Sequence, residues 1–318
     1  MTEPRLRRAR GVLWGQAVGD ALGTTVEFER AAAISSRYPR GVREVGGGGP
    51  FGLEAGQITD DTELALCLAR SLALRHRYDE NDVASRYIAW CRGNPPDCGG
   101  TTRRAFGELV PQGASVAATV RARALRDSQA NGALMRVSPL AIFGSTLDPE
   151  ALHQLAAADA TLSHPHPVCV AANQVFCFAI SYALRTEATG PEVFEATLAF
   201  TRATESCTEV IPTLELARRE LPADAFANMG WVRHALQAAF HQLLHARDFE
   251  QALVDVIGLG GDTDTNGCIA GALLGSVFGA DAIPARWMNV VRECRPRRPE
   301  VFWCHDLDAL ALALLQRP

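Results

Sequence analysis

Two sets of four glycines restrict how this chain can fold. The glycines of each set lie four residues apart, at Gly11, Gly15, Gly19 and Gly23 and at Gly267, Gly271, Gly275 and Gly279. This spacing places each set on one face of an α-helix. Because a glycine inside a helix costs about 1 kcal/mol relative to alanine, each stripe indicates close approach of another backbone. We predict that the two helices pack against each other; the alternative is that each stripe faces a different helix.

The predicted pairing has a consequence for four acidic residues. Asp20 lies within the first glycine stripe and Glu27 follows it, whereas Asp262 and Asp264 precede the second stripe. If the two helices pack together, these carboxyl groups come close to one another. Carboxylates in close contact repel one another unless a positive partner lies between them.

Apolar residues recur at helical spacing along most of the chain, and convincing strand alternation is absent. Besides the glycine-rich segments, we expect helices over 64–74 and 168–180, and over 82–92, 101–110, 149–162, 191–202, 231–246, 249–257, 266–279 and 307–316. The breaks between them are rich in Gly, Pro and Asp, but none is long enough to link independent domains. The sequence therefore predicts one all-α domain over residues 1–318.

Composition excludes several classes of protein. The net charge of −5 and the pI of about 5.9 argue against a nucleic-acid-binding face. No N-terminal signal sequence is evident, and the longest apolar run, 268–280, is too short to span a membrane. The nine cysteines form no C-x-x-C pair, which favours reduced thiols. We expect a cytoplasmic protein that binds no membrane, and a monomer, because nothing marks an oligomer interface.

Two short acidic segments each precede a predicted helix. They contain Thr59, Asp60, Asp61 and Thr62 in one case and Asp262, Asp264 and Thr265 in the other. Taken singly, each could be a helix N-cap. Taken together, their oxygen ligands suit Mg²⁺ or Mn²⁺, and converging carboxylates fit two divalent ions.

Two other metal sites can be weighed against this one. The segment DTDTNG opens like an EF-hand loop, but its twelfth position is Leu273 instead of the required glutamate, which excludes a calcium EF-hand. His305 and Asp306 are typical of helical phosphohydrolases, but the further ligands of such a site are missing because the chain soon ends.

Several motifs together resemble the ADP-ribosylglycohydrolase family. In chain order they are GQAVGDALGTTVEF at 15–28, GQITDDT at 56–62, PPDCGGTTRRAF at 95–106, NGALMR at 131–136, SHPHP at 163–167 and GLGGDTDTNGCIAGALLG at 258–275. The resemblance implies an all-α orthogonal helical bundle with a binuclear Mg²⁺ or Mn²⁺ site that removes ADP-ribose from protein side chains. It implies metal ligation by Thr59, Asp60, Asp61, Asp262, Asp264 and Thr265. Thr263 stands where alanine is usual, but a residue between two ligands is expected to point elsewhere.

Two further acids are catalytic candidates by the same resemblance. Glu27 matches a glutamate at the mouth of the site, where it would position water or gate access. Asp97, read alone, is a turn residue after two prolines. Members that act on arginine-linked ADP-ribose carry an aspartate here, which implies general acid–base chemistry at the bond to the guanidine.

The resemblance also implies contacts to ADP-ribose. The implied residues are Gly99, Gly100, Thr101 and Thr102 at a helix start, Asn131, Gly132, Met135 and Arg136, and His164 beside the diphosphate. Met135 as core and Arg136 as a structural ion pair are open alternatives. Trp231 stands where the family commonly has tyrosine; it could stack on adenine or be buried in the core.

The expected function is metal-dependent hydrolysis of the N-glycosidic bond between ADP-ribose and a protein arginine. One alternative is another ADP-ribose linkage, either serine-linked or O-acetyl-ADP-ribose. Another is a non-catalytic ADP-ribose-binding relative, against which the intact acidic set argues. The expected partner is an ADP-ribosylated protein or ADP-ribose, and not a nucleic acid.

Overall fold

The computed structural model describes residues 2–109 and 115–316, and within them it contains helices but no β-strand. The α-helices are α1 Glu3–Gly23, α2 Ala31–Arg37, α3 Asp60–Arg75, α4 Glu80–Arg92, α5 Gly100–Phe106, α6 Val116–Arg123, α7 Ser138–Gly144, α8 Pro149–Ala160, α9 Pro167–Thr186, α10 Gly190–Ala203, α11 Ile211–Ala217, α12 Val232–His245, α13 Phe249–Ile257, α14 Thr263–Phe278, α15 Ala285–Glu293 and α16 Leu307–Leu315. The prediction of an all-α protein is confirmed.

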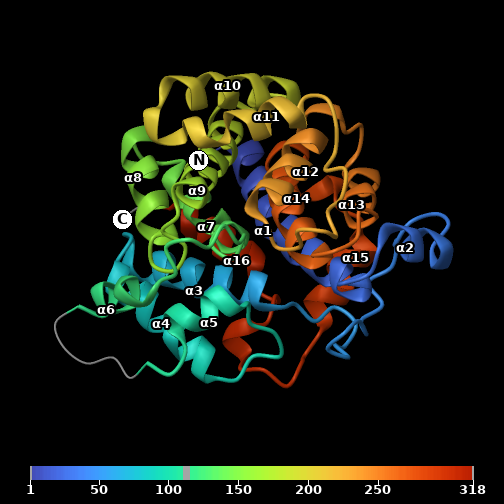
Figure 1. Ribbon diagram of the computed structural model, residues 1–318, viewed down its shortest axis with the longest axis horizontal. Helices are drawn as coiled ribbons and strands as arrows, with labels where there is room; N and C mark the ends of the chain where they lie inside the picture. The colour runs from blue at the N-terminus through green and yellow to red at the C-terminus, as the bar shows by residue number, and fades with distance from the viewer. Residues whose placement is uncertain (1, 110–114, 317–318) are drawn as a thin grey trace.

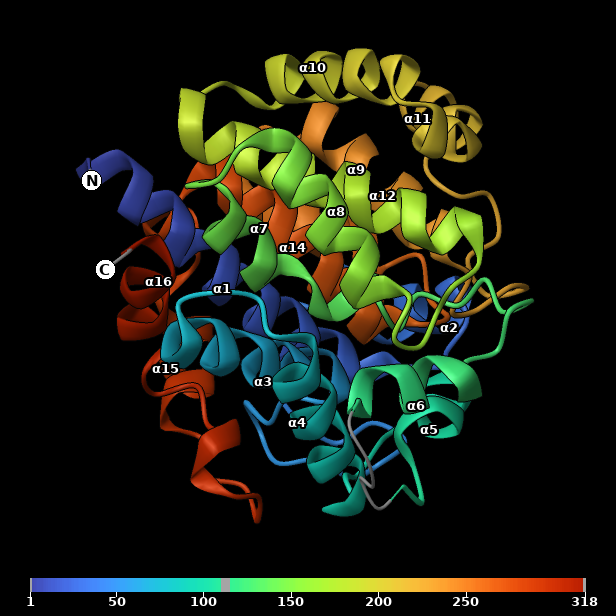
Figure 2. The ribbon, with the colours of Figure 1, turned by 90° about the vertical axis from the view of Figure 1, so that its left-hand side faces the viewer.

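Helices α1 and α14 form an antiparallel pair in the middle of the bundle (Figures 1 and 2). The glycines of the two stripes face one another in register: Gly11 meets Gly275, Gly15 meets Gly271 and Gly19 meets Gly267. A Cβ atom added to Gly15 would lie 2.1 Å from the carbonyl oxygen of Gly271. The predicted packing of the two glycine-rich helices is therefore confirmed, and the contact is backbone against backbone.

The other helices surround this pair. Helices α12 and α13 pack against α14, and α15 and α16 pack against α1. Helix α9 is the one helix in the described part of the chain that is long and apolar enough to cross a membrane, and 78% of that stretch is buried inside the protein. Its apolar surface is thus used in the core of the bundle (Figure 2).

Each predicted helix is present, with ends that shift by a few residues. The predicted helix 101–110 is shorter than expected, because α5 ends at Phe106 before Gly107, and residue 110 lies outside the described residues. Helices α2, α6, α7, α11 and α15 are not predicted by the sequence pattern. They have seven to nine residues, too few turns for a clear periodicity.

Candidate active site

The acidic segments meet because of the direction of the central helix pair. The C-terminal end of α1 lies against the N-terminal end of α14, where a Cβ on Gly23 would touch the backbone of Asp264 at 2.5 Å. The hydroxyl of Thr263 donates to the carbonyl oxygen of Gly23 at 2.7 Å. Thr263 therefore points toward α1, as predicted for a residue between two candidate ligands.

Asp20 supplies the N-terminal cap of α3 from a different helix. Its fully buried carboxylate accepts hydrogen bonds from the backbone N–H of Thr59 at 3.0 Å and of Thr62 at 3.1 Å. The Thr59 hydroxyl donates to Asp20 as well, at 3.0 Å. Asp20 thus satisfies two of the four free N–H groups at the start of α3, and the N-cap residue Thr59 makes no side-chain capping hydrogen bond.

A glycine turn brings Glu27 to the start of α14. Gly260 and Gly261 have φ values of 74° and 77°, a conformation that favours glycine. The backbone N–H of Phe28 donates to the Gly261 carbonyl oxygen at 2.8 Å, and Gly261 donates to the carbonyl oxygen of Glu29 at 2.8 Å. These two bonds hold the segment around Glu27 against the turn that precedes Asp262.

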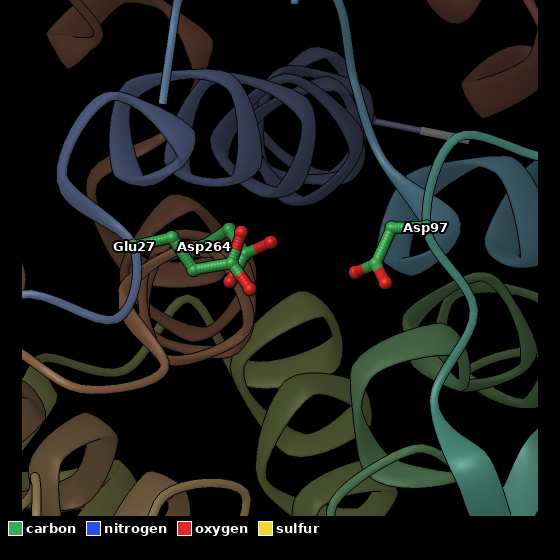
Figure 3. A group of neighbouring side chains, drawn as sticks. All are labelled: Glu27, Asp97 and Asp264. Carbon is green, nitrogen blue, oxygen red and sulfur yellow. The ribbon is translucent and has the colours of Figure 1, made fainter. Parts of the chain in front are cut away.

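Carboxylate oxygens of Glu27, Asp97 and Asp264 lie within 4.8 Å of one another. Figure 3 shows that Glu27 and Asp264 lie side by side, while Asp97 faces them from the loop before α5. Asp60 is tied to the same loop, because it accepts the backbone N–H of Gly99 at 3.3 Å. The site therefore joins segments that are far apart in the sequence.

Burial and mutual repulsion raise the pKa values of these carboxyl groups. Burial, with Asp97 and Asp262 nearby, raises the pKa of Glu27 to about 9. Burial likewise raises the pKa values of Asp60, Asp61 and Asp264 well above the usual range, and that of Asp97 to a lesser degree. No lysine or arginine lines the cavity within the described residues. Such a cluster is stable when its carboxyl groups are protonated or when a cation lies among them.

The donor atoms fit a hard divalent cation. Asp61 Oδ1 and Glu27 Oε2 are buried oxygens without a hydrogen-bond partner among the described residues. The hydroxyl of Thr59 lies 2.9 Å from Asp61 Oδ2 and 3.5 Å from Asp264 Oδ2, so it joins the two acidic segments. Neither histidine nor cysteine belongs to the cluster, which favours Mg²⁺ or Mn²⁺ over zinc.

A cavity opens beside the carboxylates, and most of the predicted site residues line it. From the predicted set these are Glu27, Asp60, Asp97, Gly99, Gly100, Thr101, Thr102, Asn131, Gly132, Met135, His164, Asp262 and Thr265. Thr59, Asp61 and Asp264 are buried next to it through the contacts given above. Asn131 Nδ2 donates to Asp262 Oδ2 at 2.6 Å, which connects the wall of the cavity with the acidic cluster.

Two predicted contacts lie elsewhere. Arg136 is fully buried and pairs with Asp159, with Nε 3.1 Å from the carboxylate, so it is a structural ion pair and not part of the cavity lining. Trp231 lines a neighbouring cavity that shares Ala130, Met229 and Gly230 with the first one. Stacking of Trp231 on adenine stays a prediction.

The cavity also has residues that the sequence analysis did not single out. Phe28 has a positive φ of 63°, which is unusual for a bulky side chain, and it is 48% exposed. Met229, 42% exposed, also lines the cavity. The position of Phe28 directly after Glu27 could have identified it as a residue near the site. Nothing in the sequence around Met229 distinguishes it from an ordinary loop residue.

The chain is similar to known ADP-ribosylglycohydrolases over nearly its whole length. The sequence profile of the ADP-ribosylglycohydrolase family matches residues 1–318. The chain is 33% identical to the ADP-ribosyl-[dinitrogen reductase] glycohydrolase of Rhodospirillum rubrum, over 97% of this chain and 100% of that protein. It is 27% identical to the ADP-ribosylarginine hydrolase Tri1 of Pseudomonas putida, over 99% of this chain and 80% of the relative. A solved structure of an ADP-ribosylglycohydrolase-related protein complex superposes with a TM-score of 0.79 at 32% identity, covering 99% of both chains.

Proposed function

Because the chain belongs to the ADP-ribosylglycohydrolase family and is an ADP-ribosyl hydrolase, we propose that its substrate is a protein carrying ADP-ribose on arginine. The reaction is hydrolysis of the N-glycosidic bond between the ribose and the guanidine. The observation that carries this proposal is Asp97, whose carboxyl group faces Glu27 and Asp264 across the cavity within 4.8 Å.

Asp97 is proposed as the general acid–base group. A guanidine leaves poorly as an anion, so cleavage requires a proton at the departing nitrogen. Burial raises the pKa of Asp97, which favours the protonated form that can donate. Its Oδ1 accepts the N–H of Cys98 at 2.7 Å, which orients the carboxyl group toward the cavity.

Two divalent ions, Mg²⁺ or Mn²⁺, are proposed to be held by Thr59, Asp60, Asp61, Asp262, Asp264 and Thr265. When bound, these ions would supply Lewis-acid and electrostatic stabilisation at the ribose hydroxyl groups. Asp20 and Asn131 orient this set from outside it, since they bind Thr59 and Asp262 respectively. Glu27, at the edge of the cluster, is proposed to position the attacking water.

The remaining cavity residues are proposed to bind ADP-ribose. Gly99, Gly100, Thr101 and Thr102 begin α5 on one wall, and Asn131, Gly132, Met135 and His164 form another. The expected state is a cytoplasmic monomer that requires no nucleic acid or membrane; it stays a prediction, as does the single domain over residues 1–318.

The test compares two peptides, one ADP-ribosylated on arginine and one on serine. We expect Mn²⁺-dependent release of ADP-ribose from the arginine peptide, loss of release in EDTA, and a fall of about 10²-fold or more in Asp97→Asn. The exposed, remote Asp281→Asn is the matched control and should retain full activity. Release from the serine peptide alone would overturn the assignment of linkage and the role of Asp97. Tight binding of ADP-ribose without release from either peptide would instead support a non-catalytic relative.

A further inference from the structure

His164 is a buried residue with an unused hydrogen-bonding atom in the cavity. Its side chain is fully buried, and it belongs to the cavity lining. Its Nε2 has no hydrogen-bond partner among the described residues. A buried nitrogen without a partner costs free energy, so its presence beside a ligand cavity indicates that the ligand supplies the partner.

The other ring nitrogen shows which tautomer is present. Arg136 Nη1 donates to Ser163 Oγ at 2.8 Å, and Ser163 Oγ lies 2.8 Å from His164 Nδ1. Since Ser163 is fully buried, its hydroxyl hydrogen needs an acceptor, and Nδ1 is the acceptor within reach. With Nδ1 accepting, the hydrogen of the neutral ring is on Nε2, which becomes a donor to the cavity.

Arg136 is held rigidly in the position that this arrangement needs. Its guanidinium also donates to the Asp159 carboxylate at 3.1 Å and to the Asp159 carbonyl oxygen at 2.9 Å. A further bond, of 3.2 Å, goes to the carbonyl oxygen of Gly132, and the guanidinium lies 4.6 Å from the ring centre of Tyr87. Arg136 thus connects the two cavity residues Gly132 and His164 from behind.

The space in front of His164 is kept open by Gly132. A Cβ atom at this position would lie 3.0 Å from His164 Cε1, 3.1 Å from Nε2 and 2.9 Å from Thr102 Oγ1. The hydroxyl of Thr102 and the imidazole Nε2 therefore flank the same point of the cavity. Two polar groups around a small residue form a place for an oxygen atom of a ligand.

The family resemblance implies that His164 lies beside the diphosphate of ADP-ribose. We propose that Arg136 and Ser163 are positioning residues, which hold His164 there as the neutral imidazole with its hydrogen on Nε2. The proposal takes from the proposed function that the ADP-ribose part of the substrate occupies this cavity; it does not depend on the linkage. The contact is a hydrogen bond and not an ion pair. Burial and the positive charge of Arg136 lower the pKa of His164 to about 3, in agreement with a neutral ring.

The first test is the protonation state of the ring, measured by ¹⁵N NMR of histidine-labelled protein. The chain has 8 histidines, and the His164 signals are assigned by their absence in His164→Gln. We expect wild-type His164 to show the Nε2–H tautomer at neutral pH. In Ser163→Ala the hydrogen should redistribute between the two nitrogens. Ser276→Ala, which removes a buried hydroxyl from the far end of α14, should leave the His164 signals unchanged.

The second test is titration of the same variants with ADP-ribose in the presence of Mg²⁺. Loss of a hydrogen bond to a charged oxygen should weaken the Kd about tenfold to hundredfold in His164→Leu, and about tenfold in Ser163→Ala. His164→Gln keeps an N–H donor of similar reach and should bind within about threefold of wild type. In hydrolysis assays these substitutions should raise KM more than they lower kcat, because the contact is to a part of the substrate that does not react.

Two results would overturn the proposal. One is an Nδ1–H tautomer or an imidazolium in the wild-type protein at neutral pH. The other is ADP-ribose binding that is equal in His164→Leu, His164→Gln and wild type. Failure of the arginine linkage is distinguishable from both, because the protein would then bind ADP-ribose through His164 without releasing it from the arginine peptide.

Discussion

In the contact between α1 and α14, replacing a glycine by alanine should destabilise the protein, although helix propensity alone predicts the opposite. Replacing a glycine by alanine in an ordinary exposed helix stabilises it by about 1 kcal/mol. At Gly15 the added Cβ would lie 2.1 Å from the Gly271 carbonyl oxygen and 2.7 Å from its carbon. Both neighbours are backbone atoms, which cannot rotate away, so we predict that Gly15→Ala destabilises the protein.

The size of the destabilisation can be judged from how far the added Cβ atom overlaps the backbone of Gly271. An ordinary Cβ contact begins at 3.4 Å, so the two helices must separate by more than 1 Å along part of their length. Overpacking a core that can repack costs about 1–3 kcal/mol, and a rigid backbone contact belongs at the upper end or beyond. We therefore expect a loss of about 3 kcal/mol in the free energy of unfolding, despite the propensity gained.

The assay is urea unfolding followed by circular dichroism, with Gly46→Ala as the control. Gly46 is exposed and has no heavy atom within 4 Å of an added Cβ. The control should change the unfolding free energy by less than about 0.5 kcal/mol. A Gly15→Ala protein that is as stable as wild type, or more stable, would refute the close backbone packing of α1 against α14.

Two further predictions concern charge. Since the folded pKa of Glu27 is about 9, above its ordinary 4.5, the metal-free fold binds this proton more tightly than the unfolded chain. The contribution of this proton to stability is complete below about pH 4.5 and is lost as the pH rises toward 9. The Tm of the metal-free protein should therefore fall between about pH 6 and about pH 8.5, and Mn²⁺ should abolish that fall. A Tm of the metal-free protein that does not depend on pH would contradict this prediction. Arg298 and Glu63 form an ion pair with side chains 7% and 2% exposed, and Glu63 also accepts a bond from Trp90 at 2.6 Å. Arg298→Met should cost about 3–5 kcal/mol in denaturant unfolding by leaving Glu63 unpaired, and Arg298→Met with Glu63→Gln should cost less than the single change; equal losses would argue against an unpaired charge as the cause.

Much of the fold could be predicted because periodic patterns report local structure. The glycine stripes also indicated a tertiary contact, because eight glycines at helical spacing, seven of them inside α1 and α14 and Gly279 just beyond the end of α14, need a common explanation. The cap of α3 could not be predicted, because its acceptor Asp20 lies 39 residues before Thr59 in another helix. This cap from a different helix supplies the acceptor that the sequence analysis had sought among the acidic residues of the segment itself.

The sequence also could not predict which residues of one short motif face the cavity. Asn131, Gly132 and Met135 line the cavity, whereas Arg136 in the same motif points to Asp159 in α8. Met135 and Arg136 are neighbours in one short 3-10 turn, Leu134–Arg136, and no periodicity in so short a segment shows which side chain faces a ligand. The resemblance of the motif implied a substrate contact for all four residues. The structure shows that Asn131, Gly132 and Met135 line the cavity, whereas Arg136 supports its wall from behind.

The acidic segments at the starts of α3 and α14 are proposed to form a site for divalent cations. The most direct measurement is an anomalous difference map at the manganese edge from crystals grown with Mn²⁺, collected for wild type and Asp61→Asn. We expect two peaks among Asp60, Asp61, Asp262 and Asp264 in the wild type and loss of at least one in the variant. Absence of any peak there, with the carboxylates in the positions described, would contradict the proposed metal site.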